Sequence, residues 1–275
     1  MINVKATCLS LWKSIKAYRA VLVVIVLVKL MVALVFSSPL QNQIYIPFFT
    51  QFLQGFQNPW DYFYVYNQNI HFPYPPLLLY IYSAALIPYV FFFQTIHWLG
   101  NLLIKLPSLM ADMCIFVLLV KLFPDKVKRI IIFYFCSPIV LYSCYMYAHL
   151  DLVPIALLTL SIFLLVRERV LASAILLGCA MGAKAPTVAV FPIAVIYVFR
   201  NFPLKKCFSF FITPWIVYLG IILPYMSSTG YQSEVLHNKE QLQLFSLVVK
   251  LGELNIYIIP MVILMFYVKF FLYNK

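Results

Sequence analysis

Long apolar runs recur along this chain, and short clusters of Lys and Arg separate them. Each run is close to the roughly 20 residues that cross a bilayer as a helix. Residues are 64% hydrophobic and 10% charged, against about 45–50% and 25% in soluble domains. This composition excludes a soluble enzyme and a disordered chain, and continuous runs exclude the alternating strands of a β-barrel. We therefore predict an all-α, polytopic transmembrane helical bundle.

The net charge of +12 follows the same pattern. Basic residues cluster at 5–19, 121–129, 167–169 and 200–206, always beside apolar runs. Cytoplasmic loops carry such clusters under the positive-inside rule, so we attribute the charge to topology and expect no nucleic-acid partner. The six cysteines show no metal-ligand spacing and are interpreted as packing residues.

Placing every basic cluster inside gives about ten crossings with both termini cytoplasmic. The predicted spans are 19–37, two short crossings within 74–104, then 105–121, 129–147, 151–166, 170–182, 186–199, 208–225 and 254–272. They form one transmembrane domain over residues 1–275, with outer loops at 38–73 and 226–250. We expect an integral, multi-pass membrane protein, preferably of a bacterial inner membrane.

The first outer loop is rich in aromatic and amide side chains. Its aromatic residues follow helical spacing, which predicts a helix lying in the membrane interface: Tyr45, Phe48, Phe49, Phe52 and Phe56. Gly55 and the pair Asn58-Pro59 then end this helix. This composition favours a substrate that is part lipid and part sugar.

Charged residues inside apolar segments mark candidate functional sites. Lys105 and Asp112 are seven residues apart and share one helical face, which suggests a phosphate-binding lysine beside a buried carboxylate. The structural alternative is a lysine that reaches the membrane surface and an aspartate paired inside the bundle. Lys29 lies mid-span, where it contacts either a lipid head group or a polar neighbour.

Short breaks between spans carry the other candidates. His149 and Asp151 lie in one tight turn and could position a sugar hydroxyl or remove its proton, whereas Asp151 could instead cap the following helix. Lys184 lies in a Gly- and Pro-containing break, which suits a lipid phosphate; reaching to the interface is the alternative. Asp61, the one acid of the first outer loop, is either a catalytic or sugar-binding carboxylate or a turn cap.

Several motifs occur in an ordered series over about residues 40–200: GFQNPWD at 55–61, YPPL at 74–77, KLPSLMAD at 105–112, SP at 137–138, AHLD at 148–151 and GCAMGAKAP at 178–186. Together they resemble the GT-C superfamily of integral-membrane glycosyltransferases, especially its mannosyltransferase-like branch. The resemblance implies a polyprenyl-phosphate sugar donor used on the outer face, and an early loop acid that acts as base or metal ligand. Gln43 stands where that acid is expected.

These observations predict a hexosyltransferase that moves a hexose, with mannose as one candidate, from a polyprenyl-phosphate carrier to a lipid-linked or surface glycan. Asp61 or Asp151 would be the catalytic base, and Lys184 and Lys105 would hold the donor phosphate. Asp112 and His149 would orient their neighbours. No ligand cluster predicts a metal, although a divalent cation stays open. The alternatives are a non-catalytic subunit that binds a lipid-linked sugar for a partner enzyme, and a lipid-glycan flippase or transporter.

Overall fold

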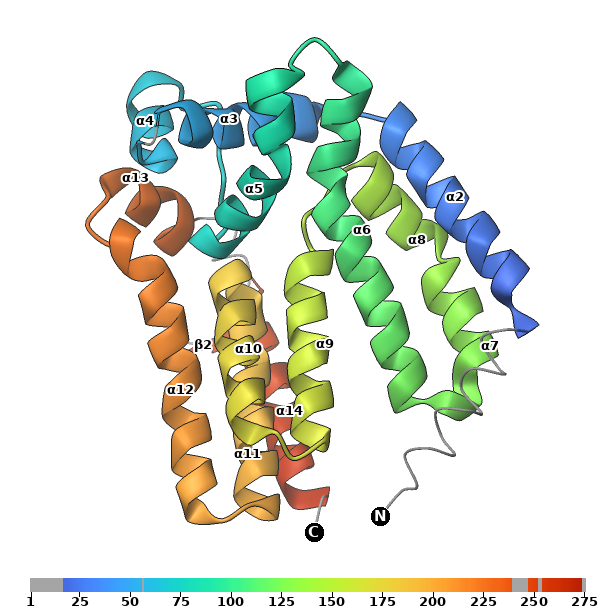
Figure 1. The fold of residues 1–275 in the computed structure, drawn as a ribbon. Helices are drawn as coiled ribbons and strands as arrows, with labels where there is room; N and C mark the ends of the chain where they lie inside the picture. The colour runs from blue at the N-terminus through green and yellow to red at the C-terminus, as the bar shows by residue number, and fades with distance from the viewer. Residues whose placement is uncertain (1–16, 56, 239–246, 252–253, 274–275) are drawn as a thin grey trace.

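The structure is a computed structural model that describes residues 17–55, 57–238, 247–251 and 254–273. Helices dominate it (Figure 1). The first helix of the described residues is α2 (Arg19–Val35), and the chain bends by 60° between it and the segment formed by the π-helix η1 (Leu40–Tyr45) and helix α3 (Ile46–Gly55). Helices α3 and α4 (Pro59–Tyr66) lie across one end of the molecule (Figure 1).

The local sequence explains both ends of this crosswise segment. Helix α3 ends at Gly55, and α4 begins after Asn58, whose side-chain oxygen accepts a hydrogen bond from the Trp60 backbone N–H at 3.1 Å. Pro59 occupies the first helical position, where no backbone N–H is needed. The predicted aromatic helix is therefore confirmed. Phe48 and Phe49 are fully buried against protein, and Phe56 lies outside the described residues. The position of this helix in the membrane interface stays a prediction.

Helices α5 (Pro76–Phe92) and α6 (His97–Leu122) form an antiparallel pair. The two short crossings predicted within 74–104 are not found, because α5 is one helix and residues 97–104 already belong to α6. The predicted span at 105–121 likewise begins eight residues earlier, at His97.

A broken helical run follows, with η2 (Pro124–Lys126), α7 (Val127–Ile130), η3 (Ile131–Phe135), α8 (Pro138–Val140) and η4 (Leu141–Met146). Segments η3 and η4 are π-helical, a conformation that often marks functional sites. This run packs beside α2 and α6, where the rings of Phe116 and Phe135 stack with their centres 4.5 Å apart.

A second group of helices comprises α9 (Leu152–Val166), α10 (Val170–Ala183), η5 (Ala185–Val190), α11 (Phe191–Asn201), α12 (Leu204–Ile222) and η6 (Leu223–Tyr225). Helix α10 packs against both α9 and α12. Gly178 allows the close approach of α12, since an added Cβ would lie 2.6 Å from the Pro214 carbonyl oxygen. Ser161 and Ser173 join α9 to α10 with their hydroxyls 3.0 Å apart.

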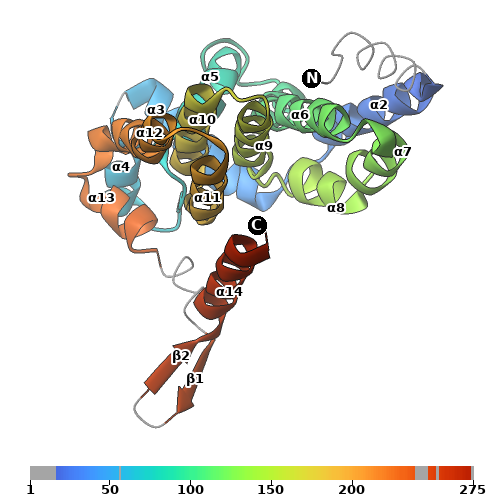
Figure 2. The same ribbon diagram turned by 90° about the horizontal axis from the view of Figure 1, so that it is seen from below.

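The last described elements are α13 (Thr229–Tyr231), the π-helix η7 (Gln232–Leu236), β1 (Val248–Leu251), β2 (Leu254–Tyr257) and α14 (Ile258–Tyr273). Strands β1 and β2 pair antiparallel, with Val248 opposite Tyr257. This hairpin extends away from the helices (Figure 2) and qualifies the all-α prediction.

Within the described residues, three helical segments are long and apolar enough to cross a membrane: His97–Leu122, Pro124–Met146 and Leu204–Tyr225. A fourth is added if the bent pair of α2 with η1 and α3 counts as one span. The predicted count of about ten crossings is therefore not confirmed. Other apolar helices have only 10–17 residues. The bounds of α9 and α10 agree with the predicted segments at 151–166 and 170–182, but such short helices are not counted as spans.

Candidate functional site

A cavity of about 700 Å³ opens where three distant parts of the chain meet. The aromatic segment (residues 38–73), the turn before α9 and the π-helix η7 all contribute to its wall. The described residues that line it are Leu40, Ile44, Tyr45, Tyr64, Gln68, His71, Pro73, Tyr74, His149, Ser233, Glu234, His237 and Asn238. Aromatic rings with a few hydroxyl, amide and imidazole groups are typical of the lining of a small-molecule binding site.

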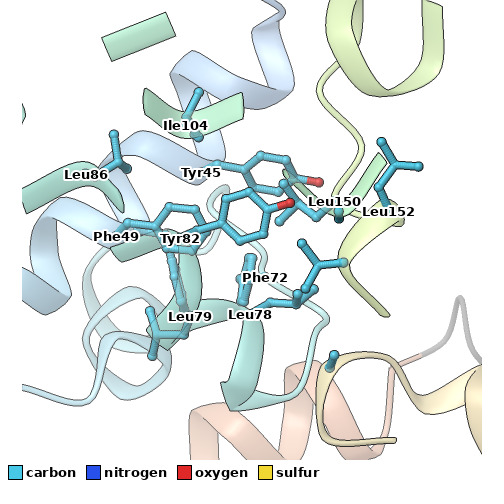
Figure 3. Close-up of a cluster of buried hydrophobic side chains, with 14 of the residues drawn as sticks. Tyr45, Phe49, Phe72, Leu78, Leu79, Tyr82, Leu86, Ile104, Leu150 and Leu152 are labelled. Carbon is cyan, nitrogen blue, oxygen red and sulfur yellow. The ribbon is translucent and has the colours of Figure 1, made fainter. Parts of the chain in front are cut away.

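A buried aromatic core holds the aromatic segment in place beneath this cavity. The ring centres of Phe48 and Phe72 are 4.7 Å apart, and Tyr45 meets Phe72 edge to face at 6.0 Å. The Trp60 indole N–H donates to the Phe72 carbonyl at 3.0 Å. Figure 3 shows the Tyr45 hydroxyl directed toward Leu150, next to the turn that carries His149 and Asp151. The cavity wall is therefore anchored to a rigid core.

An ion pair lies beside Tyr74 at the edge of the cavity, although neither of its two residues is part of the cavity lining. The Lys184 ammonium donates a hydrogen bond to the Asp151 carboxylate, and the two side chains are 30% and 35% exposed. The Lys184 nitrogen also lies 5.8 Å from the ring centre of Tyr74, which lines the cavity. Asp151 is the N-cap residue of α9, as the sequence suggested, but its side chain makes no capping hydrogen bond. The pair brings together two of the predicted site residues that lie 33 positions apart.

His149 reaches the cavity from a strained turn. Ala148, buried and not a glycine, adopts the left-handed conformation with φ 64°, which costs about 1–2 kcal/mol for an L-residue. Two hydrogen bonds hold the turn: the His149 N–H donates to the Ser143 carbonyl at 2.9 Å, and the Ser38 hydroxyl donates to the Tyr147 carbonyl at 2.8 Å. Such strain is kept where the surroundings enforce it, often at binding sites.

Glu234 lines the same cavity and was not among the predicted site residues. Its Oε2 accepts a hydrogen bond from the Phe72 N–H at 3.1 Å, and its Oε1 lies 3.8 Å from Nδ1 of His71. Burial raises the pKa of this carboxyl, while the Phe72 N–H and His71 act in the opposite direction. The sequence signal was an acid and a histidine, Glu234 and His237, in the second long loop; Lys239 and Glu240 of that loop lie outside the described residues.

Residues 63–200, half of the chain, match the family model of the alpha-(1->6)-mannopyranosyltransferase N-terminal domain, MptA_B. The chain belongs to this family. It is accordingly a membrane glycosyltransferase of the mannosyltransferase type, in agreement with the predicted resemblance at that level. No curated protein and no solved structure matches the chain.

The region shared with the mannosyltransferase family contains His149, Asp151 and Lys184 but not Asp61. Asp61 lies in the first turn of α4, facing α13, and is not part of the cavity lining. Its carboxylate accepts hydrogen bonds from the Ser228 hydroxyl at 2.7 Å, the Gly230 N–H at 2.9 Å and the Asn58 amide at 2.9 Å. Through these hydrogen bonds Asp61 joins the start of α4 to the start of α13.

Lys105 and Asp112 also belong to the shared region, yet the structure does not bring them together. Asp112 is fully buried and binds Lys29, whose ammonium lies 2.5 Å from Oδ2. The hydroxyls of Tyr134 and Tyr145 donate to the same carboxylate at 2.8 and 2.6 Å. Lys29 also lies over the Phe135 ring, 3.9 Å from its centre. A cluster of this kind satisfies both charges inside the bundle.

Lys105 points to a different partner, the end of α2. Its buried ammonium donates to the carbonyl oxygens of Ala33, at 3.3 Å, and of Phe36. A cation placed there satisfies carbonyl groups that a helix end leaves without partners and complements its dipole. Neither Lys105 nor Asp112 lines the cavity, so both are placed as packing groups of the α2–α6 contact.

The family resemblance predicts an acidic residue early in the aromatic segment, and this chain has Gln43 there instead. Gln43, which stands at that position, is exposed on η1 and is absent from the cavity lining. In the described part of the chain, no group of three or more His, Cys, Asp or Glu side chains is arranged to hold a metal ion. The divalent cation that the sequence left open stays a prediction.

Proposed function

We propose that this chain transfers a hexose, with mannose the first to test, from a polyprenyl-phosphate carrier to a lipid-linked or surface glycan on the non-cytoplasmic face. The observation that carries the proposal is the polar and aromatic cavity with the Lys184–Asp151 pair at its edge, in a chain of a mannopyranosyltransferase family. The reaction is a direct displacement at the anomeric carbon of the sugar.

Lys184 is the residue proposed to bind the donor phosphate. When the bond from the anomeric carbon to the phosphate oxygen breaks, the electron pair stays on the phosphate, and a fixed cation stabilises that charge. An ammonium has three N–H donors, so Lys184 can hold Asp151 and still donate to a phosphate. Asp151 then positions the ammonium, and His149 is placed to bind a sugar hydroxyl inside the cavity.

The distribution of charge supports an orientation with the cavity outside. The basic clusters at 167–169 and 200–206 lie at the far end of α9, α10 and α12 from α4 and α13 (Figure 1). Under the positive-inside rule that far end is cytoplasmic. We accordingly propose a multi-pass protein of a bacterial inner membrane whose cavity faces away from the cytoplasm.

The first experiment measures transfer of label from radiolabelled polyprenyl-phosphate mannose and glucose to membrane glycolipids, with the purified chain alone. We expect labelled product, and we expect Lys184→Ala to lower kcat by roughly 10²-fold, as for other lost transition-state donors. Lys205→Ala removes an exposed lysine at the opposite end and serves as the matched control. Assays with and without EDTA test the divalent cation.

Gln43 favours one alternative, a non-catalytic subunit that binds a lipid-linked sugar for a partner enzyme. That function predicts saturable donor binding without transfer, and transfer only when the partner is added. If neither transfer nor binding occurs with either donor, the polyprenyl-phosphate assignment is wrong for these two sugars.

A further inference from the structure

We propose that Glu234 is the general base of this transfer and takes the proton from the attacking hydroxyl of the acceptor. The inference rests on the proposed function and adds a catalytic residue outside the region matched by the family model, residues 63–200. It starts from the position of Glu234 on η7, where the π-helix directs a buried carboxylate into the cavity.

The structure orients this carboxylate from one side. Oε2 is held by the backbone N–H of Phe72, a fully buried residue whose carbonyl is in turn bound by Trp60. Oε1 lies 3.8 Å from Nδ1 of His71, beyond hydrogen-bonding distance. One oxygen is thus fixed to the core, and the other is placed to accept a proton from a bound hydroxyl.

The other acids near the cavity are already engaged. Among the described residues that line it, Glu234 is the one carboxylate. Asp61 accepts three hydrogen bonds that join α4 to α13, and Asp151 is paired with Lys184. A base must reach the hydroxyl in the bound geometry, and Glu234 meets that requirement better than either aspartate predicted from the sequence.

The buried environment of Glu234 also favours its role as a base. Burial raises the pKa of Glu234, and this makes the carboxylate a stronger base than an exposed Glu. The imidazole of His71 acts against this rise in the pKa of Glu234. The other titratable side chains that line the cavity with it are His149, His237, Tyr45, Tyr64 and Tyr74.

The acceptor O–H bond breaks and its proton moves to Oε1 of Glu234, while the acceptor oxygen forms a bond to the anomeric carbon. The bond between that carbon and the phosphate oxygen breaks, and its electron pair leaves with the polyprenyl phosphate beside Lys184. Glu234 then loses the proton to solvent.

The test compares Glu234→Gln, Glu234→Asp and the control Glu168→Gln in the purified full chain, with polyprenyl-phosphate mannose as donor. Gln keeps an acceptor for the Phe72 N–H but cannot take a proton. We expect Glu234→Gln to lower kcat by roughly 10²–10⁴-fold with the donor KM within about threefold, and Glu234→Asp to recover part of the rate. Glu168→Gln changes an exposed turn residue and leaves kcat as in the wild type.

The pH dependence of kcat/KM distinguishes a base from a residue that only maintains the fold, because substitution of a structural residue would not change it. Because the base must be ionised, wild-type kcat/KM falls as pH falls through the raised pKa of Glu234, and the residual rate of Glu234→Gln lacks this acid limb. His71→Asn removes the opposing positive charge, so its acid limb moves to higher pH.

The outcomes separate this inference from the proposed function. If the wild type transfers sugar and Glu234→Gln keeps more than a tenth of its kcat, Glu234 is not the base, although the function stands. A raised donor KM with unchanged kcat overturns the base in favour of a binding role. If Glu234→Gln fails to fold, Glu234→Asp decides, since a folded Asp variant that keeps the full wild-type kcat contradicts the assignment. Absence of transfer by the wild type overturns the proposed function first.

Discussion

Lys29 and Asp112 are both almost completely buried, and each is acceptable inside the bundle because of the other. Removing a charge from water costs several kcal/mol, and a close partner with further hydrogen bonds is needed to offset that cost. Tyr134 and Tyr145 supply two such bonds to Asp112. We therefore expect Lys29→Met alone to destabilise the chain by about 3–5 kcal/mol, because it leaves a buried carboxylate without its cation.

The matched experiment is a double-mutant cycle with Lys29→Met, Asp112→Leu and the double variant, followed by denaturant unfolding in detergent. The double variant removes both charges and regains most of the lost stability. Additive losses in the two single variants would show that the two side chains do not stabilise each other.

The interaction partners of several single residues could not be predicted from the sequence. Lys29 could be recognised as an expensive charge, but its partner lies 83 positions away, and no local spacing reveals it. Asp151 has the position of a helix cap, yet its carboxylate forms an ion pair with Lys184 and makes no capping hydrogen bond. Glu234 was visible as an acid in a long loop. Its role in the site depends on a hydrogen bond to Phe72, 162 residues away, which only the fold creates.

At the scale of elements, close helix packing depends on small residues at the contact. Gly178 of α10 faces α12, and a Cβ there would lie 2.6 Å from the Pro214 carbonyl and 2.7 Å from Val217. We expect Gly178→Ala to cost about 1–3 kcal/mol, because the backbone of α12 must move. Gly220, inside α12 with nothing within 4 Å of its Cβ position, is the matched control.

Gly220→Ala gains the better helix propensity of alanine and is expected to be neutral or to stabilise by up to about 1 kcal/mol. Thermal unfolding of both variants in the same detergent tests the pair. Equal effects of the two substitutions would show that the α10–α12 contact is looser than the structure has it.

Elements with strong local signals could be predicted, and those without them could not. Gly55 and the pair Asn58-Pro59 marked the end of α3, whereas the helix α4 that begins at Pro59 was not predicted. The stretch 74–104 carries no charge or topological marker, so its division into α5 and the first turns of α6 stayed hidden. The π-helices η1 and η7, which border the cavity, have no sequence pattern of their own, although they decide which side chains face it.

For the whole molecule, the fold class and the membrane environment follow from composition, whereas the number of crossings does not. Hydropathy finds apolar segments but does not show whether a helix of 10–17 residues spans the bilayer or only part of it. The distribution of basic residues is more informative, because it distinguishes the two ends of α9, α10 and α12. That asymmetry makes the orientation of the cavity testable without knowledge of the substrate.

We expect the cavity to face the side opposite the basic clusters. Single cysteines at Asn67, an exposed residue of the aromatic segment, and at Lys205, an exposed residue near the turn between α11 and α12, report on the two ends in a cysteine-free background. In intact bacterial spheroplasts, a membrane-impermeant maleimide should label the Asn67→Cys protein, because the positive-inside rule places the basic end in the cytoplasm. The Lys205→Cys protein should react only after permeabilisation. The reverse pattern would place the cavity in the cytoplasm, and a cavity there could not use a sugar donor presented on the outer face.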